Sequence, residues 1–345
     1  MEIQTYLSEV SALPGLSGNE RAVAEYVKKQ FEPFCDEVTI DCMFNVIAHK
    51  KGTGPKVMLA AHMDEIGLMV VKIEDDGCLR MGNVGGVDPR VLPGTQVWVY
   101  GREKLFGTIG AKPPHLQTAD EGKKNYRRED LFVDVGLPVE KVRELVQIGD
   151  LITFNAPSTS LKNNRFACKT MDDRACVGIM LLCAERLMKM KYEADIWFVA
   201  TTQEEVGSRG ARAAAFDLEP DLGIALDVCH ATIPGSRPDT TSDIGSLVTA
   251  MGPYLQPKLV QRLLDTAKRH NVTLQTEVDA RSTSTDCDEL QISRAGIPSI
   301  LLELPLKYMH TSVELIDLNA LSEGGRLLAH FMAELSSGWE EDLWI

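Results

Sequence analysis

The stretch TTQEEVGSRGA, residues 201–211, decides how the chain can be interpreted. Two adjacent glutamates, Glu204 and Glu205, follow the apolar run IWFVA at 196–200, which predicts a buried strand. Because neighbouring residues of an extended chain point to opposite faces, the two carboxylates are expected to have different tasks. Gly207 then allows a tight turn. A solvated acidic turn has the same pattern, so the rest of the chain must decide between the two interpretations.

Length and charge limit the classes of protein to consider. A chain of 345 residues favours two domains, and 44% hydrophobic residues suffice for a sizeable core. The formal net charge of −14 argues against a nucleic-acid partner, because the neutralisation of phosphates requires a basic face.

The sequence also argues against a membrane partner and for a cytoplasmic location. No apolar run approaches the roughly 20 residues of a membrane-spanning helix, and the first ten residues contain no signal-peptide core. The eight cysteines form no CxxC pair, and several lie in apolar stretches, as is typical of reduced, buried thiols.

Residues 1–66 and 158–345 alternate between predicted strands and helices. The strands are expected at 37–40, 45–49, 57–61, 196–201, 222–226 and 299–304. The helices are expected from residue 18 or 19 to just before Pro33, and then from residue 172 onward, at 257–270, 285–295 and 318–335. The first of these helices has a Ser-x-x-Glu capping box at Ser17 to Glu20. This alternation predicts an α/β catalytic domain with a mostly parallel sheet flanked by helices.

Residues 67–157 have a different pattern of hydrophobic and turn residues. Short alternating strands are separated by turn residues, and the single predicted helix covers 139–146. The segment 112–130 is polar and is expected to be the least structured part of this region. The chain is therefore predicted to carry a small all-β domain inserted into the α/β domain.

Polar side chains are predicted to meet at one edge of the main sheet. In open α/β sheets ligands bind beyond the carboxyl ends of the strands. Four predicted strand ends and one helix start offer the candidates His62, Glu204 with Glu205, Asp227, His310 and Asp172. Imidazoles and carboxylates suit zinc, cobalt or manganese, and five ligands suit two ions if one carboxylate bridges them. Two dications would balance three carboxylates and one hydroxide.

Simpler interpretations exist for several of these residues. Asp172 or Asp173 could cap a helix, and a loop residue such as His310 is by default a surface histidine. The pairing of His62 with Asp64 favours a metal ligand, because a carboxylate commonly orients a ligating imidazole. Substrate contacts are considered for two further histidines, His115 and His230.

Five stretches in this order resemble the M42 family of cocatalytic metallo-aminopeptidases, which includes the glutamyl and tetrahedral aminopeptidases. The stretches are AHMDEIGLMV at 61–70, KTMDDRACVG at 169–178, TTQEEVGSRGA at 201–211, ALDVCHA at 225–231 and LPLKYMHTSVE at 304–314. The resemblance extends along essentially the whole chain. Its mild departures, such as Cys229 after Asp227, affect no candidate ligand.

The resemblance implies a role for each candidate residue. His62 and Asp227 would hold one ion, Glu205 and His310 would hold the other, and Asp172 would bridge them. Glu204 would be the general base, and Asp64 would orient His62. The implied cofactors are two divalent ions per subunit, zinc or cobalt, with manganese as a further candidate.

The resemblance also implies an activity and an assembly. The chain would remove N-terminal residues from peptides, and its inserted domain would form dimers that build a hollow tetrahedral dodecamer. A carboxypeptidase or deacylase with the same metal core and a non-catalytic shell or binding protein are the alternatives. The tail tryptophans Trp339 and Trp344 are expected to pack on the catalytic domain or on a neighbouring subunit.

Overall fold

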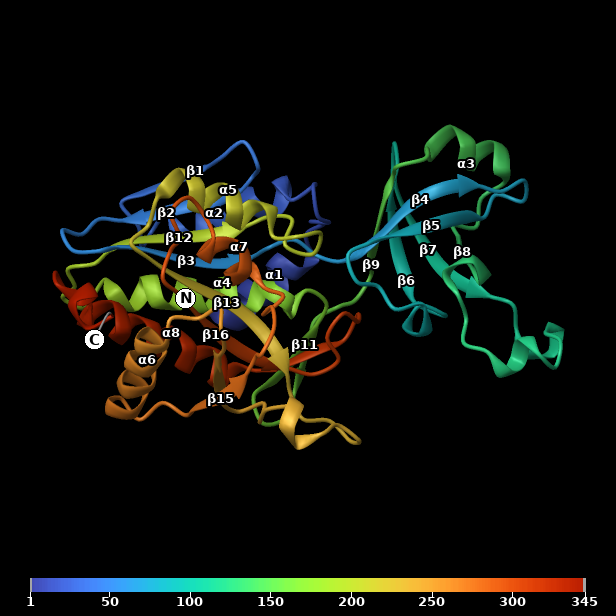
Figure 1. The fold of residues 1–345 in the computed structure, drawn as a ribbon. Helices are drawn as coiled ribbons and strands as arrows, with labels where there is room; N and C mark the ends of the chain where they lie inside the picture. The colour runs from blue at the N-terminus through green and yellow to red at the C-terminus, as the bar shows by residue number, and fades with distance from the viewer. Residues whose placement is uncertain (1, 344–345) are drawn as a thin grey trace.

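The computed structural model describes residues 2–343 and consists of two bodies. Figure 1 shows a large sheet with helices on both faces and, projecting from one side, a small barrel. The barrel strands run from Gly67 to Phe154, between the two parts of the chain that build the larger body. This arrangement confirms the predicted fold class, an α/β protein with an inserted all-β unit.

The large sheet has eight strands, and its centre is parallel. Across the sheet the order is β1 (Glu37–Ile40), β2 (Val46–Lys50), β12 (Asp195–Thr201), β3 (Lys56–His62), β13 (Leu222–His230), β16 (Ser299–Leu306), β14 (Leu247–Met251) and β15 (Leu274–Val278). The four strands from β12 to β16 are parallel, whereas β1, β2 and β14 pair antiparallel to their inner neighbours. The strands β14 and β15 were not predicted.

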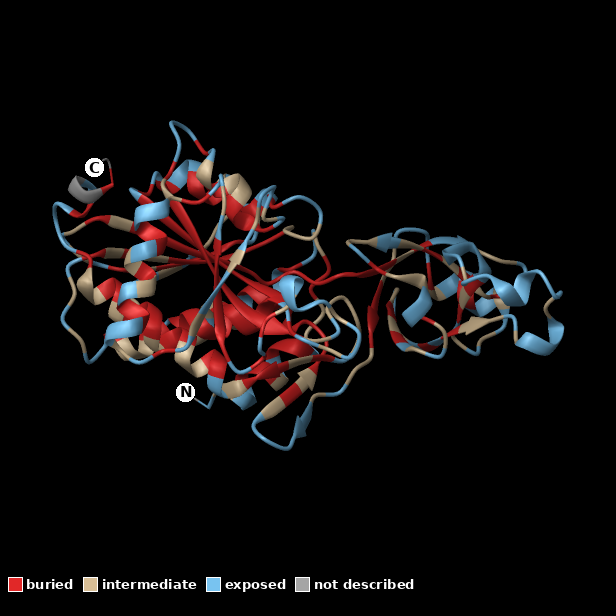
Figure 2. Ribbon diagram, turned by 60° about the horizontal axis from the view of Figure 1, so that its bottom comes forward, coloured by how far each residue is buried: buried red, intermediate tan, exposed pale blue. Residues whose placement is uncertain are grey.

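Helices bury both faces of this sheet. One face packs against α1 (Ile3–Ala12), α2 (Arg21–Phe31), α4 (Met171–Leu187), α6 (Pro257–Arg269) and α8 (Leu318–Glu334); the other packs against α5 (Arg209–Leu218) and α7 (Asp286–Gln291). Successive residues of a strand point to opposite faces, so Leu59 belongs to the first core and Met58 to the second. Figure 2 shows the central strands of this sheet buried, whereas the outer strands β1 and β15 are partly exposed.

The N-terminal helices differ from the prediction. Helix α1 was not predicted, and α2 begins at Arg21 without a side-chain cap from Ser17. The Ser17 hydroxyl instead donates to Asp64, at 2.6 Å, and the Glu20 carboxylate accepts from the backbone N–H of Gly18, at 2.7 Å. The side chains of Ser17 and Glu20 therefore make these other hydrogen bonds and do not form a capping box.

The inserted unit is a closed antiparallel barrel with its own core. Around the barrel the order is β4 (Gly67–Ile73), β5 (Leu79–Val84), β8 (Leu131–Asp134), β7 (Lys104–Ala111), β6 (Gln96–Tyr100) and β9 (Leu151–Phe154), and α3 (Val139–Leu145) packs beside it. Closure leaves no unpaired strand edge. Residues 112–130 form only short 3-10 turns and are largely exposed, as expected for this segment.

Three further sequence expectations can be compared with the structure. No helix within residues 2–343 is long and apolar enough to cross a membrane. All eight cysteines are free, and five of them are buried. Trp339 is 8% exposed and packs against the main core, whereas Trp344 lies outside the described residues. A small third sheet consists of β10 (Thr159–Leu161), β11 (Arg165–Cys168) and β17 (Glu314–Asp317).

Candidate metal centre and active site

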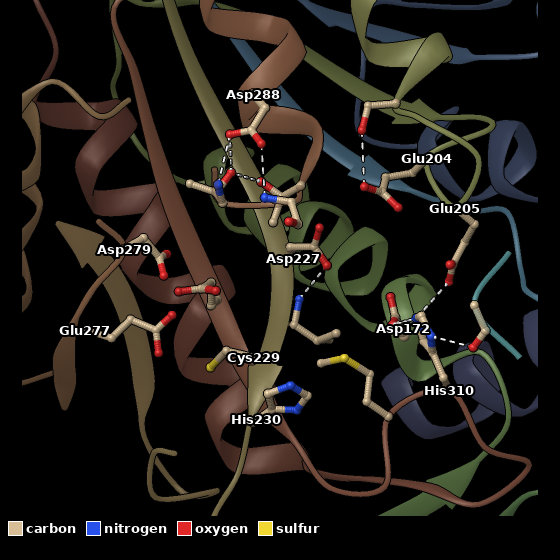
Figure 3. A pocket seen from close by; sticks show the side chains of 18 of the residues that line it. Asp172, Glu204, Glu205, Asp227, Cys229, His230, Glu277, Asp279, Asp288 and His310 are labelled. Atoms are coloured by element: carbon tan, nitrogen blue, oxygen red, sulfur yellow. Dashed lines mark hydrogen bonds and ion pairs between the residues drawn. The ribbon is translucent and has the colours of Figure 1, made fainter. Parts of the chain in front are cut away.

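The predicted site residues converge beyond the carboxyl ends of the central strands. His62 ends β3, Glu204 and Glu205 follow β12, and Asp172 lies at the start of α4. His310 lies in the loop after β16, as predicted, whereas Asp227 differs from the prediction because it lies within β13, which continues to His230. Figure 3 shows five of these residues around one cavity: Asp172, Glu204, Glu205, Asp227 and His310.

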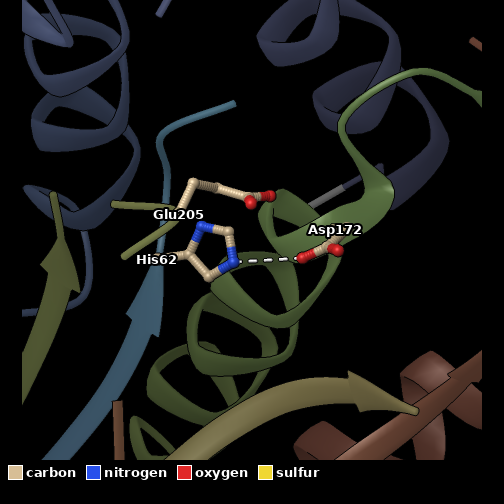
Figure 4. Close-up of side chains that lie close together, drawn as sticks. All are labelled: His62, Asp172 and Glu205. Atoms are coloured by element: carbon tan, nitrogen blue, oxygen red, sulfur yellow. Dashed lines mark hydrogen bonds and ion pairs between the residues drawn. The ribbon is translucent and has the colours of Figure 1, made fainter. Parts of the chain in front are cut away.

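Asp172 lies between the two histidines. Its Oδ1 is 3.0 Å from Nε2 of His62, and its Oδ2 is 3.3 Å from Nε2 of His310. Figure 4 shows His62 pointing toward Asp172, with Glu205 beside them. Because each carboxylate oxygen faces a different imidazole, Asp172 has the geometry of a ligand shared by two adjacent ions.

The His310 ring is oriented by the barrel. Its Nε2 lies 3.3 Å from Oε1 of Glu205, and its Nδ1 lies 2.9 Å from the carbonyl oxygen of Gly86, in the loop after β5. A hydrogen bond from Nδ1–H to that carbonyl leaves the Nε2 lone pair directed toward the carboxylates. A backbone carbonyl has no sequence signal, so this contact could not be predicted from the sequence.

Asp64 organises several groups at once. Its Oδ1 lies 3.4 Å from Nδ1 of His62 and accepts the backbone N–H of Glu204 at 3.0 Å. Its Oδ2 accepts the Ser17 hydroxyl and, at 3.3 Å, the backbone N–H of Glu205. Although burial opposes it, hydrogen bonding from His62 lowers the pKa of Asp64, which is therefore a carboxylate. Asp64 thus holds the backbone of the glutamate pair as well as one imidazole.

Glu314 is a buried carboxyl that the sequence analysis quoted in a motif without giving it a role. It is 2% exposed. One of its oxygens accepts the backbone N–H of Asp172 at 3.1 Å, and the other accepts the backbone N–H of His310 at 2.9 Å. Glu314 therefore fixes the distance between two candidate ligands that are far apart in sequence.

Asp173 is a second residue whose part was not foreseen. It is completely buried, its Oδ2 accepts the backbone N–H of His62 at 3.2 Å, and its Oδ1 has no hydrogen-bond partner. It makes no capping hydrogen bond to α4, so the helix-cap interpretation is wrong for this residue. Ligand atoms of His62, Asp173 and Asp227 all lie within 4.8 Å of one another.

Burial leaves this cluster with an excess of negative charge. Burial raises the pKa of Glu204 to about 9 and raises the pKa values of Asp173 and Asp227 well above their ordinary range. Hydrogen bonding, first to Asp172, raises the pKa of His310 to about 11. The raised pKa values of the carboxyls reflect the cost of ionising them in a buried site, and nearby divalent ions would stabilise the ionised carboxylates.

The residues present fit divalent metal ions. Two overlapping groups have ligand atoms within 4.8 Å of one another: His62 with Asp172 and Glu205, and His62 with Asp173 and Asp227. Imidazole nitrogen and carboxylate oxygen are the donors that zinc, cobalt and manganese accept. The unpartnered oxygen of Asp173 is the kind of buried polar atom that requires a partner.

The cavity in front of these residues has a volume of about 770 Å³, enough to hold part of a peptide. Cys229 and His230, at the end of β13, also line it. His115 lies in a 3-10 turn of the barrel and does not line the cavity. Of the two histidines considered for substrate contact, only His230 is in a position to make one here.

Comparisons with known proteins agree with this geometry. The family model described as M42 glutamyl aminopeptidase matches residues 45–327. A lysyl aminopeptidase of Pyrococcus furiosus is 38% identical over 336 residues, which cover 95% of this chain and 96% of the relative.

Solved structures extend the likeness to the whole fold. An aminopeptidase of the archaeon Desulfurococcus kamchatkensis is similar with a TM-score of 0.93 and 31% identity, and the match covers 100% of this chain and 98% of that chain. The TET1 peptidase of Pyrococcus horikoshii, described as able to assemble into a tetrahedron or a large octahedral shell, has a TM-score of 0.84 and 28% identity, covering 97% and 100%. These matches include the barrel as well as the sheet.

Proposed function

The chain belongs to the M42 glutamyl aminopeptidase family and is a metal-dependent aminopeptidase; from this premise we propose that it uses two divalent ions and Glu204 as the general base. The observation that carries the proposal is the position of Asp172, whose two oxygens face two different imidazoles. A single ion would not require a carboxylate in that arrangement.

The proposed ligand sets are those that the resemblance to the M42 family implies. His62 and Asp227 hold one ion, Glu205 and His310 hold the other, and Asp172 bridges them. The support is the 3.3 Å separation between Nε2 of His310 and Oε1 of Glu205, together with the nearness of Asp227 to His62. Zinc and cobalt both accept these donors, and manganese remains compatible with them.

Glu204 is the proposed proton carrier. When bound, two divalent ions polarise the scissile carbonyl and lower the pKa of the attacking water. Glu204 takes the proton of that water and gives it to the leaving amine. Its Oε1 accepts the Ser208 hydroxyl at 3.1 Å, and its Oε2 lies 3.9 Å from Nε2 of His62, which places the carboxyl beside the ligands. Neighbouring dications would lower its pKa from about 9 toward the range of a useful base.

The variant Glu204→Gln tests this division of labour. We expect turnover of aminoacyl-anilides to fall by about 10²- to 10⁴-fold, because a general base is lost, while two ions per subunit remain bound. Ser208→Ala is the matched control, because it removes only a neutral partner of the same carboxyl. Near-normal turnover by Glu204→Gln, with its metal content intact, would show that the base is another group.

The same assay separates the alternative functions. Cleavage of N-acylated amino acids in preference to aminoacyl-anilides would indicate a carboxypeptidase or deacylase. Metal analysis that finds no divalent ion under replete conditions would indicate a binding protein. Either result would refute the proposed reaction.

We further propose that the barrel mediates self-association and that the peptide-hydrolysing particle is a tetrahedral dodecamer. The support is the likeness to the Pyrococcus horikoshii peptidase, which covers the whole chain and includes the barrel. The barrel projects from the sheet, so its surface is accessible to a second copy (Figure 1). Light scattering that finds only monomers at every metal concentration would refute the assembly.

A further inference from the structure

Acidic side chains line the active-site cavity well beyond the proposed metal ligands. No lysine or arginine is among the described residues that line it. The carboxylates outside the metal centre are Asp239, Glu277, Asp279, Asp288, Glu289 and Glu303. The side chains that line the substrate cavity therefore carry a strongly negative formal charge.

Half of these carboxylates already have partners. Asp239 forms an ion pair with Arg237, and Oε2 of Glu289 lies 3.4 Å from a guanidinium nitrogen of Arg212. Asp288 accepts hydrogen bonds from the loop before α7, including the Thr283 hydroxyl at 2.7 Å. Nearby arginines or hydrogen-bond donors already stabilise the charges of these three carboxylates, so the three do not require a ligand.

Glu303 differs from them because it is buried without a counterion. It lies in β16 directly beside Asp227 of β13 in the parallel register, and it is 4% exposed. Its Oε2 has no hydrogen-bond partner, and ligand atoms of Glu303 and Glu277 lie within 4.8 Å of each other. A buried polar atom that faces a cavity and lacks a partner indicates a missing ligand.

Glu277 and Asp279 complete this acidic subsite. Both lie at the end of the sheet that carries β15, are partly buried and line the same cavity. Figure 3 shows them on the opposite side of Asp227 from His310. Burial raises the pKa of each of these three carboxyls, and the one basic group that lowers the pKa of Glu277 is the imidazole of His230. A cation placed among them would relieve this unfavourable burial of negative charge.

We propose that Glu277, Asp279 and Glu303 bind the cationic side chain of the substrate's N-terminal residue, so that the enzyme prefers lysine or arginine at that position. This inference rests on the proposed aminopeptidase function, which brings the N-terminal residue to the metal centre. Neighbouring strands are about 4.8 Å apart, so Glu303 lies one strand spacing from the proposed ligand Asp227. The four-carbon stem of a lysine can cross that distance.

The chemistry of the subsite matches such a side chain. An ammonium group offers three donors and no acceptor, and three carboxylates can accept from it. An acidic N-terminal residue would meet like charges there, which is a device for rejecting it. The subsite therefore favours a basic residue and disfavours a glutamyl one, even though the family as a whole is described by its glutamyl aminopeptidases.

A third divalent ion is the competing occupant. Ligand atoms of Cys229, Glu277 and Glu303 lie within 4.8 Å of one another, as in the metal centre. The substrate side chain is favoured because the group contains no imidazole and combines a soft thiol with hard carboxylates, which is a poor match for one ion. Ion counting distinguishes the two occupants.

The first test uses the wild-type enzyme loaded with two ions. We expect kcat/KM for a lysyl-anilide to exceed that for the Nε-acetyl-lysyl-anilide by about 10- to 100-fold, because acetylation removes only the charge. Arginyl-anilide should resemble lysyl-anilide, and glutamyl-anilide should be the poorest substrate. Equal rates for the lysyl and acetyl-lysyl substrates, or faster cleavage of a glutamyl or leucyl substrate, would overturn the subsite.

The second test uses the variants Glu303→Gln and Glu277→Gln. Each should move the ratio of kcat/KM values for lysyl and acetyl-lysyl substrates toward one, by about tenfold, because a charged acceptor is lost. Asp239→Asn, a cavity acid already paired with Arg237, is the matched control and should keep the wild-type ratio. If Glu303→Gln does not fold, the proposal is still tested by the Glu277→Gln variant, whose substituted residue is only partly buried, and by the wild-type ratio of kcat/KM values. A wild-type ratio retained by Glu277→Gln would overturn the subsite.

The outcomes separate this inference from the proposed function. If the loaded enzyme cleaves no aminoacyl-anilide, the aminopeptidase mechanism fails. If it cleaves them without preference for a basic residue, only the subsite fails. Three ions per wild-type subunit that become two in Glu303→Gln would assign the carboxylates to a metal and overturn the subsite.

Discussion

The sheet and the barrel both contribute to the metal centre, but with different parts of the chain. The sheet side supplies most of the proposed ligand side chains, among them His62 and Asp172, which lie 3.0 Å apart. The barrel supplies backbone: the Gly86 carbonyl faces His310, and at Gly85 a Cβ would lie 3.2 Å from Oε2 of Glu205. Gly85 also has a φ of 72°, which favours glycine.

This difference divides the centre into two halves. The half built on His62 depends on the sheet body alone, whereas the half built on Glu205 and His310 also depends on how the barrel sits against it. An added Cβ at Gly86 would lie 2.7 Å from Nδ1 of His310, which leaves no room for a side chain there. With the proposed ligand sets, the barrel would therefore influence the ion held by Glu205 and His310 and not the ion held by His62 and Asp227.

The largest expected effect comes from the sheet side. Asp172→Ala removes the carboxylate shared by both halves, so we expect both ions to be lost and turnover to fall about a thousandfold or more. Metal analysis and anilide hydrolysis measure this. Asp75→Asn, on the exposed surface of the barrel, is the control. Retention of both ions by Asp172→Ala would contradict a shared ligand.

Asp64→Asn should have the next largest effect, because the carboxylate holds His62 and the backbone of both glutamates. We expect activity to fall about 100-fold, as for other partners of metal ligands. Ser17→Ala removes one of the donors to the same carboxylate and should have a smaller effect. Equal losses in the two variants would show that Asp64 acts mainly through Ser17.

Gly86→Ala tests the contribution of the barrel. The added methyl group displaces His310, so we expect about tenfold weaker binding of one ion of the two. Isothermal titration with the metal resolves the two sites. Gly122→Ala, where the nearest atom to a Cβ is 3.6 Å away, is the matched control. Equal weakening of both ions would contradict the division into halves.

The smallest effect concerns the two hydrophobic cores. Ile109→Val in the barrel and Ile224→Val in the sheet should each lower the free energy of unfolding by about 0.5–1.5 kcal/mol. Because the cores are separate, the double variant should match the sum within about 0.5 kcal/mol. Urea unfolding measures these values. A larger coupling would show that the two cores pack as one unit.

Local patterns predicted much of this architecture. The strand predicted at 37–40 matches β1, and the predicted strand at 57–61 differs from β3 by one residue at each end. Hydrophobic periodicity and turn residues are local properties of the sequence, so they can be recognised without knowledge of the fold. The strands β14 and β15 and helix α1 were not predicted.

The sequence by itself determined which side chains could hold metal and placed two glutamates together after one strand, whereas their separate roles were implied only by the family resemblance. The tertiary structure decided what lies between and behind them: Glu314 joining Asp172 to His310, the Gly86 carbonyl, and Glu303 beside Asp227. Whether a side chain can bind a metal ion depends on its residue type, which the sequence gives directly. Distance, burial and the lack of a counterion arise only when segments far apart in the chain pack together.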